Sequence, residues 1–127
     1  MAMKQCRILV IDDSTTNVVL LEAILSEKGY HIETALNARE AFIKLEKQLP
    51  DLILLDLLMP KVNGFEFLEQ LRKEERTKET PVIVISALNT DDENYKKIGK
   101  LDAVDFIRKP IDIQYLVNLV GKVLENS

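Results

Sequence analysis

The sequence is poor in the features that mark several classes of protein. Only one of its 127 residues is a cysteine, Cys6, so neither a disulfide framework nor a cysteine-rich metal site is expected. No apolar run approaches the roughly 18 residues that span a bilayer, and the N-terminus does not have the layout of a signal peptide. The net charge of −4 provides no basic face for nucleic acid. We therefore expect a cytoplasmic chain that binds neither membrane nor nucleic acid directly.

The chain also has no internal repeat, low-complexity tract or linker, so we expect residues 1–127 to form a single domain, free-standing or part of a longer protein. Hydrophobic residues make up 46%, which is enough for a core. Short apolar runs alternate with segments of helical periodicity. The runs predict strands at residues 7–12, 31–35, 52–56, 81–86 and 103–107. The periodic segments predict helices at residues 15–28, 37–47, 64–72, 90–99 and 112–125.

This alternation predicts an α/β fold of the (βα)5 type, a doubly wound sandwich in which helices cover both faces of a five-stranded parallel sheet. In the flavodoxin-like strand order 2-1-3-4-5, the first and third strands are neighbours at the switch point. Sheets of this kind bind ligands beyond the carboxyl ends of their strands. The informative residues should therefore lie where strands end.

Charged and polar side chains stand at four of these strand ends. Asp12 and Asp13 end the first strand, Asp56 ends the third, Ser86 ends the fourth and Lys109 follows the fifth. Each alone has an ordinary interpretation, as a helix cap, a turn residue, a backbone-bonded hydroxyl or a solvated lysine. Together they favour a site, because crowded carboxylates repel one another and a divalent cation would relieve that repulsion. Oxygen ligands without histidine or cysteine favour Mg²⁺, Mn²⁺ or Ca²⁺.

Four segments carry a resemblance to a known family. They are "ILVIDDS", "LILLDLLMPKVNGFEFLEQLR", "PVIVISAL" and "DFIRKPI", and they follow one another with the family's spacing over essentially the whole chain. With them the chain resembles the receiver domain of bacterial two-component response regulators, which has a CheY-like fold. The resemblance implies a phosphoaccepting module of phosphorelay signal transduction. It also implies that the chain is no enzyme beyond its own phosphorylation and dephosphorylation.

The resemblance assigns the acids and their cofactor. Asp56 would be the phosphoacceptor. Asp13, Asp56 and the backbone carbonyl of Leu58 would bind Mg²⁺, for which Mn²⁺ is a possible substitute, and Asp12 would act through a metal-bound water. These roles agree with the needs of phosphoryl transfer, which depends on positioning and charge neutralisation.

The resemblance also assigns the remaining strand-end residues. Ser86 would hydrogen-bond a phosphoryl oxygen and Lys109 would pair with another. Phe106 matches the switch aromatic, which would turn inward as Ser86 moves toward the phosphoryl group. Pro110 is expected to follow a cis peptide bond. The surface formed by residues 90–99, 103–107 and 112–125 would then change shape.

The implied partners are a histidine kinase or histidine phosphotransfer protein as donor, and an effector domain or protein, or a second copy of the chain, on the switched surface. Three alternatives are open. A phosphatase of the haloacid-dehalogenase type would need a second aspartate where Leu58 stands. A flavodoxin-like cofactor binder is disfavoured because the loop "DDSTTN" is acidic and free of glycine. A receiver-like interaction domain that is never phosphorylated is disfavoured by the complete set of site residues.

Three further features carry expectations. Asp102 stands where the family commonly has glycine before the last strand, and it would be tolerated there if φ is positive. The charged stretch at residues 72–80 is expected to be solvated. The last helix has more apolar residues than one core face needs, so either it is broadly buried or Val117, Leu124 and Tyr95 contribute to a partner surface.

Leu58 stands two residues after Asp56, and Leu88 stands two residues after Ser86. These two leucines lead to the first prediction. Family members often carry polar groups there that help or hinder the attacking water, whereas two leucines offer it no hydrogen bond. We expect unassisted dephosphorylation of Asp56 to be slow. The measurement is the lifetime of the phosphorylated chain, and a lifetime equal to that of a Leu58→Asn, Leu88→Glu variant would contradict the prediction.

Overall fold

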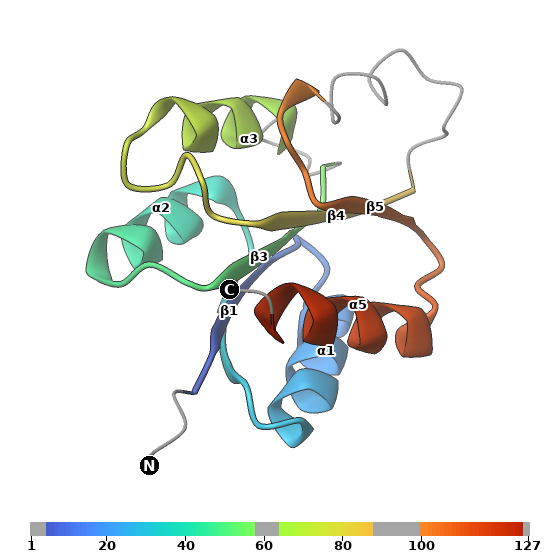
Figure 1. Cartoon of the computed structure of the whole chain (residues 1–127). Helices are drawn as coiled ribbons and strands as arrows, with labels where there is room; N and C mark the ends of the chain where they lie inside the picture. The colour runs from blue at the N-terminus through green and yellow to red at the C-terminus, as the bar shows by residue number, and fades with distance from the viewer. Residues whose placement is uncertain (1–4, 58–63, 88–99, 126–127) are drawn as a thin grey trace.

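A five-stranded parallel sheet forms the centre of the computed structural model, which describes residues 5–57, 64–87 and 100–125 (Figure 1). The strands are β1 (Arg7–Ile11), β2 (His31–Ala35), β3 (Leu52–Leu55), β4 (Val82–Ser86) and β5 (Asp105–Arg108). They lie in the order β2-β1-β3-β4-β5, and every neighbouring pair is parallel. The predicted α/β fold and its flavodoxin-like strand order are therefore confirmed.

Helices cover both faces of the sheet. α1 (Thr15–Glu27) and α5 (Ile113–Glu125) lie on one face, and α2 (Ala38–Lys47) and α3 (Gly64–Lys73) lie on the other (Figure 1). The helix predicted at residues 90–99 lies outside the described residues. Within the described parts of the chain, no helix combines the length and apolar character needed to cross a membrane.

Two apolar layers, one on each face of the sheet, join the helices to the strands. Leu52 and Leu54 of β3 belong to the layer with α1 and α5. Ile53 and Leu55 belong to the layer with α2 and α3. All of these side chains are at most 1% exposed. A central strand buried on both faces explains the continuous apolar run, and its carboxyl end delivers Asp56 to the edge of the sheet.

Local interactions define both ends of α1. Ser14 is the N-cap, and its Oγ accepts a hydrogen bond from the backbone N–H of Asn17 at 3.3 Å. Gly29 follows the helix with φ 96°, a left-handed conformation that glycine adopts without the usual steric cost. The cap at Ser14 ties the first turn of α1 to the segment that leaves β1.

Gly64 begins α3 in close contact with the end of β3. A Cβ atom at this position would lie 2.4 Å from the Cα of Leu57, so any other residue would force the backbone apart. The backbone N–H of Gly64 donates to the carbonyl of Leu57 at 3.1 Å. The two ends of the segment between Leu57 and Gly64 are therefore held together, directly beside Asp56.

Arg72, at the end of α3, is not the solvated side chain that the charged stretch suggested. Its guanidinium donates to five backbone carbonyls, at distances of 2.8–3.3 Å, and these belong to Thr77, Lys78, Thr80, Leu101 and Asp102. Burial lowers the pKa of Arg72, and the charge of Asp102 partly offsets this effect. Arg72 thus connects α3, the loop before β4 and the turn before β5.

The turn before β5 contains Asp102 with φ 57°. This is the positive φ that the sequence suggested for a position where glycine is common in the family. A non-glycine residue in this conformation costs about 1–2 kcal/mol. The hydrogen bond from Arg72 to the carbonyl of Asp102 stabilises the same turn.

α5 is a broadly buried helix. Leu116, Val120 and Leu124 are buried, and Val117 is half-buried. The alternative in which Leu124 contributes to a partner surface is wrong, because the side chain packs in the core and is only 7% exposed. Tyr95, named for the same surface, lies outside the described residues.

The connections of Arg72 lead to a stability prediction. Arg72→Met should lower the free energy of unfolding by about 2–4 kcal/mol, because five backbone carbonyls, three of them in partly buried hydrogen bonds, lose a charged donor. Arg76→Met is a matched control and should cost less than about 1 kcal/mol, since among the described residues Arg76 donates only to the carbonyl of Leu45, at 3.3 Å. Urea denaturation measures both values, and equal losses in the two variants would contradict the central role of Arg72.

Candidate functional site

Three aspartates meet where β1 and β3 end. Asp12 and Asp13 follow β1, and Asp56 follows β3, its neighbour in the sheet. One carboxylate oxygen from each lies within 4.8 Å of the others. Asp12 and Asp56 are only 3% and 4% exposed, whereas Asp13 is exposed. The strand order therefore brings together the three acids that the sequence singled out.

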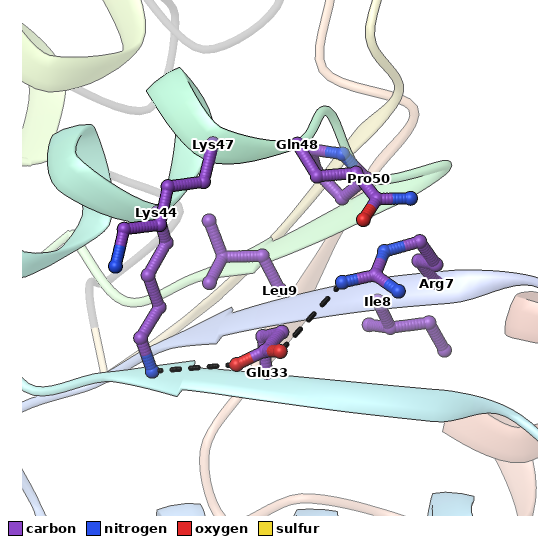
Figure 2. A pocket seen from close by; sticks show the side chains of 8 residues that line it. All are labelled: Arg7, Ile8, Leu9, Glu33, Lys44, Lys47, Gln48 and Pro50. Atoms are coloured by element: carbon purple, nitrogen blue, oxygen red, sulfur yellow. Dashed lines mark ion pairs between the residues drawn. The ribbon is translucent and has the colours of Figure 1, made fainter.

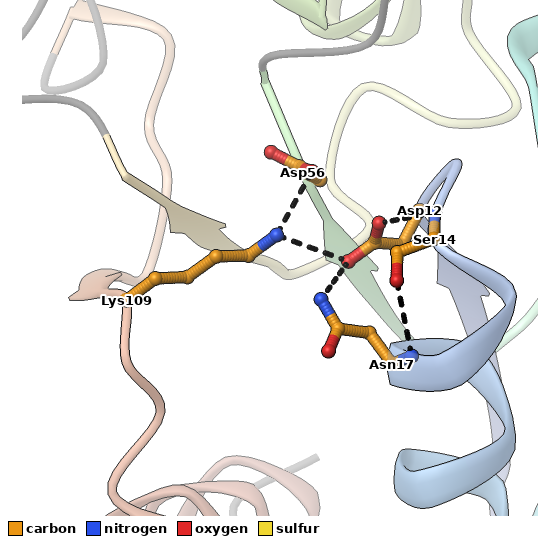
Figure 3. Close-up of polar contacts among 5 residues, drawn as sticks. All are labelled: Asp12, Ser14, Asn17, Asp56 and Lys109. Atoms are coloured by element: carbon orange, nitrogen blue, oxygen red, sulfur yellow. Dashed lines mark hydrogen bonds and ion pairs between the residues drawn. The ribbon is translucent and has the colours of Figure 1, made fainter.

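Both carboxylate oxygens of Asp12 accept hydrogen bonds (Figure 3). Its Oδ1 accepts a hydrogen bond from the backbone N–H of Ser14 at 2.9 Å. Its Oδ2 lies 3.4 Å from the Nδ2 of Asn17 and 3.4 Å from the Nζ of Lys109. Donors on both oxygens stabilise the charged form of a buried carboxylate.

Lys109 lies between two of the acids. Its Nζ is 3.1 Å from Oδ2 of Asp56 and 3.4 Å from Oδ2 of Asp12 (Figure 3). Burial alone would lower the pKa of Lys109, but the hydrogen bond to Asp56 and the charges of both acids raise it overall. The ammonium group is therefore charged at neutral pH, and it offsets part of the repulsion among the carboxylates.

The backbone around Lys109 joins two more strand ends. The N–H of Lys109 donates to the carbonyl of Ser86 at 2.9 Å, so the lysine begins beside the end of β4. The peptide bond between Lys109 and Pro110 is cis, the geometry that the resemblance implies.

Ser86 and Phe106 lie on the same face of the sheet. Ser86 is fully buried at the end of β4, and Phe106 of β5 is half-buried. In the register between these strands Val84 pairs with Phe106 and Ser86 pairs with Arg108. Val84 and Ser86 are two residues apart on β4, so their side chains share a face of the sheet. Phe106, which pairs with Val84, lies on the same face and packs against the apolar layer with α2 and α3.

Some predicted site residues cannot be placed, and one was missed. Leu58, whose carbonyl was expected to bind the metal, and Leu88 lie outside the described residues. Asn17 was not predicted, although it contacts Asp12. Its signal in the sequence was its place in the first turn of the helix that follows the paired aspartates.

The composition of the acid cluster fits a hard divalent cation. Its ligand atoms are carboxylate oxygens only, which suit Mg²⁺, and no histidine or cysteine is among them. Asp13 is exposed, so the cluster is open to solvent on its side. Mg²⁺ usually retains several waters and takes few protein ligands. The described residues are therefore compatible with a shallow magnesium site.

A cavity of about 320 Å³ lies elsewhere, between the start of β1, β2 and the last turn of α2 (Figure 2). Its lysines and arginine suggest an anion site, but Glu33 is 3.6 Å from both Arg7 and Lys44. The hydrogen bond to His31 and the charge of Lys44 outweigh burial and lower the pKa of Glu33. Lys44 also donates to the carbonyl of Thr34 on the edge strand, where a lysine discourages pairing with another strand. These contacts favour a structural role for the cavity.

Comparisons with known proteins agree with this geometry. A family model described as "Response regulator receiver domain" matches residues 8–121. The protein PilH of Pseudomonas aeruginosa is 35% identical over 119 residues, which cover 93% of this chain and 97% of PilH. The response regulator PleD of Caulobacter vibrioides is 40% identical over 106 residues, which cover 84% of this chain but only 23% of PleD.

A solved structure is similar over the same extent. The crystal structure of a response regulator receiver protein from Pseudomonas putida superimposes with a TM-score of 0.89 at 30% identity, over 95% of this chain and 99% of that one. The likeness thus covers nearly all of both chains.

The position of Lys109 leads to a pH-dependent prediction. Lys109→Met should lower the free energy of unfolding near neutral pH by about 1–3 kcal/mol, because Asp12 and Asp56 lose their cation. Despite burial, contacts with Asp56 and Asp12 raise the pKa of Lys109 in the folded chain, so the wild type loses this stabilisation as the pH rises through that pKa. The deficit should therefore be full near neutral pH and shrink by about pH 11.

Urea denaturation at both pH values measures this effect. Lys47→Met is the control, because Lys47 forms no ion pair or hydrogen bond within the part of the chain that the structure describes. It should leave stability and its pH dependence unchanged. A loss in Lys109→Met that does not vary with pH would contradict the electrostatic explanation.

Proposed function

The chain belongs to the response regulator receiver domain family, and from that membership we propose that Asp56 accepts a phosphoryl group from a phosphohistidine donor. One observation carries the assignment. Asp56 is the buried acid that ends the central strand, and it lies 3.1 Å from an ammonium group within a cluster of carboxylates. The chain then acts as a phosphorelay signalling module, and it catalyses only its own phosphorylation and dephosphorylation.

The proposed reaction is a direct transfer. A carboxylate oxygen of Asp56 forms a bond to phosphorus while the phosphorus–nitrogen bond of the donor breaks, and the electron pair of that bond returns to the imidazole nitrogen. Lys109, already beside Asp56, pairs with a phosphoryl oxygen as a compact point charge. The Ser86 hydroxyl donates to another phosphoryl oxygen. Positioning and charge neutralisation supply most of the catalysis in reactions of this type.

Mg²⁺ is the cofactor that this donor set would hold, with Mn²⁺ as a substitute. Asp13, Asp56 and the backbone carbonyl of Leu58 would be its protein ligands, and Asp12 would act through a water. When bound, the cation neutralises charge on the transferring oxygens. The mutual proximity of the three carboxylates supports this proposal.

The switch is proposed to run from Ser86 to Phe106. Movement of the Ser86 side chain toward a phosphoryl group opens space on the face of β4 that Phe106 shares. The ring of Phe106 then turns inward and changes the surface formed by the segment before β5, β5 itself and α5. Reversing a 1:99 equilibrium would need about 5.5 kcal/mol of differential stabilisation, so a partial shift read by a partner suffices.

The donor is proposed to be a histidine kinase or a histidine phosphotransfer protein that docks on α1. Val19 and Leu20 on this helix are 59% and 45% exposed, and Ala23 is exposed one turn later. An apolar strip of this kind suits an apolar helix of a partner. It lies on the helix whose first turn carries the contacts to Asp12.

The output surface is proposed to bind an effector domain or protein, or a second copy of the chain. The chain spans only about a quarter of PleD and nearly all of PilH, so the relatives include both long and short proteins. We propose that residues 1–127 form one receiver domain that works in the cytoplasm.

Phosphorylation in vitro tests the proposed function. Incubation with acetyl phosphate and Mg²⁺ should add one phosphoryl group to the wild-type chain and none to Asp56→Asn, because the nucleophile is lost. Asp51→Asn is the matched control. Asp51 precedes β3, accepts a hydrogen bond from the backbone N–H of Arg7 and lies outside the acid cluster. Intact-protein mass spectrometry measures the products. A wild-type chain without added mass, or a modified Asp56→Asn, would contradict the proposal.

A further inference from the structure

Asn17 is a side chain of the acid cluster with no role assigned so far. It is half-buried in the first turn of α1, and its Nδ2 lies 3.4 Å from Oδ2 of Asp12 (Figure 3). Its backbone N–H is already engaged, because it donates to the Oγ of Ser14. The amide group of Asn17 is thus directed at Asp12 and is not needed for the helix cap.

The first turn of α1 departs from the usual capping arrangement in a way that concerns Asp12. Asn17 is the third residue of the helix after the N-cap, where glutamate or glutamine often accepts a hydrogen bond from the N-cap backbone. Here Oδ1 of Asp12 accepts that bond from Ser14 instead. Asn17 can therefore act as a donor to the other oxygen of Asp12, and it avoids placing a fourth carboxylate in the cluster.

Oδ2 of Asp12 is shared by two donors at the same distance. Asn17 and Lys109 both lie 3.4 Å from it, and Lys109 is closer to Asp56, at 3.1 Å. When Lys109 turns toward a phosphoryl oxygen, its contact with Asp12 weakens. Asn17 is then the side-chain donor that stays on Oδ2, because it is anchored in the helix.

We propose that Asn17 is a positioning residue that keeps the Asp12 carboxylate oriented for the Mg²⁺ site, both in the resting chain and when Lys109 moves to the phosphoryl group. The inference rests on the proposed function and adds to it a residue that acts through Asp12. Together with the backbone N–H of Ser14, the amide of Asn17 makes the first turn of α1 a rigid support for that carboxylate. Partners of this kind commonly influence metal affinity.

Magnesium binding by the metal alone tests the proposal. Asn17→Leu, which keeps the size but removes the donor, should raise the Mg²⁺ dissociation constant about three- to tenfold in isothermal titration calorimetry. Asn17→Ala should also raise the Mg²⁺ dissociation constant, and it replaces the first variant if Asn17→Leu does not fold. Thr16→Ala, an exposed neighbour on the same turn, is the control and should bind Mg²⁺ as the wild type does.

Two readouts separate this role from a structural one. The urea midpoint of metal-free Asn17→Leu should stay close to that of the wild type, because the cap at Ser14 uses the backbone of residue 17 and Lys109 still contacts Oδ2 of Asp12. The rate with acetyl phosphate should fall at low Mg²⁺ and return to within about twofold of the wild-type rate at saturating Mg²⁺. A slower rate with unchanged Mg²⁺ dependence would overturn the proposal.

A double-mutant cycle tests whether Asn17 acts through Asp12. In an Asp12→Asn background, Asn17→Leu should change the Mg²⁺ dissociation constant by less than about twofold. An equal effect in both backgrounds, or wild-type affinity in Asn17→Leu, would overturn the inference while leaving the proposed function intact. A wild-type chain that neither binds Mg²⁺ nor accepts a phosphoryl group would overturn both.

Discussion

The ammonium group of Lys109 lies between the carboxylates of Asp12 and Asp56, and the carboxyl end of the sheet depends on this contact. Two of the three clustered acids are buried, and buried carboxylates need compensating charge and donors. Lys109 supplies the charge from the end of β5, and its backbone N–H is bonded to the end of β4. Four strand ends therefore meet at one residue, Lys109, and the proposed phosphoryl chemistry depends on the same arrangement.

Most of the fold and most of the site could be predicted from the sequence, for physical reasons. A strand buried on both faces and an amphipathic helix leave different patterns of apolar residues, so the elements within the described residues were located to within two residues at each end. Parallel strands bring their carboxyl ends to one edge, which is why Asp12, Asp13 and Asp56 could be grouped before their positions were known. The roles assigned to these residues remain proposals, since they depend on ligands and on residues such as Leu58.

What escaped prediction depends on three-dimensional details that no periodicity reports. Asn17 is an ordinary residue for the start of a helix, and its contact exists because the turn after β1 folds back on Asp12. Leu124 was left between the core and a partner surface, because the sequence does not reveal how α5 rests on the sheet. Arg72 sits in a charged stretch, yet it binds carbonyls about 30 residues away, and such long-range hydrogen bonds leave no local pattern.

The contact between Gly64 and Leu57 has a consequence for how this fold can vary. The hydrogen bond between their backbones holds the two ends of the intervening segment together, and the absence of a Cβ on Gly64 allows this close contact. The cost of closing a loop rises only slowly with its length. Changes in the length of that segment can therefore leave Asp56 in place, as long as Leu57 and Gly64 stay in contact.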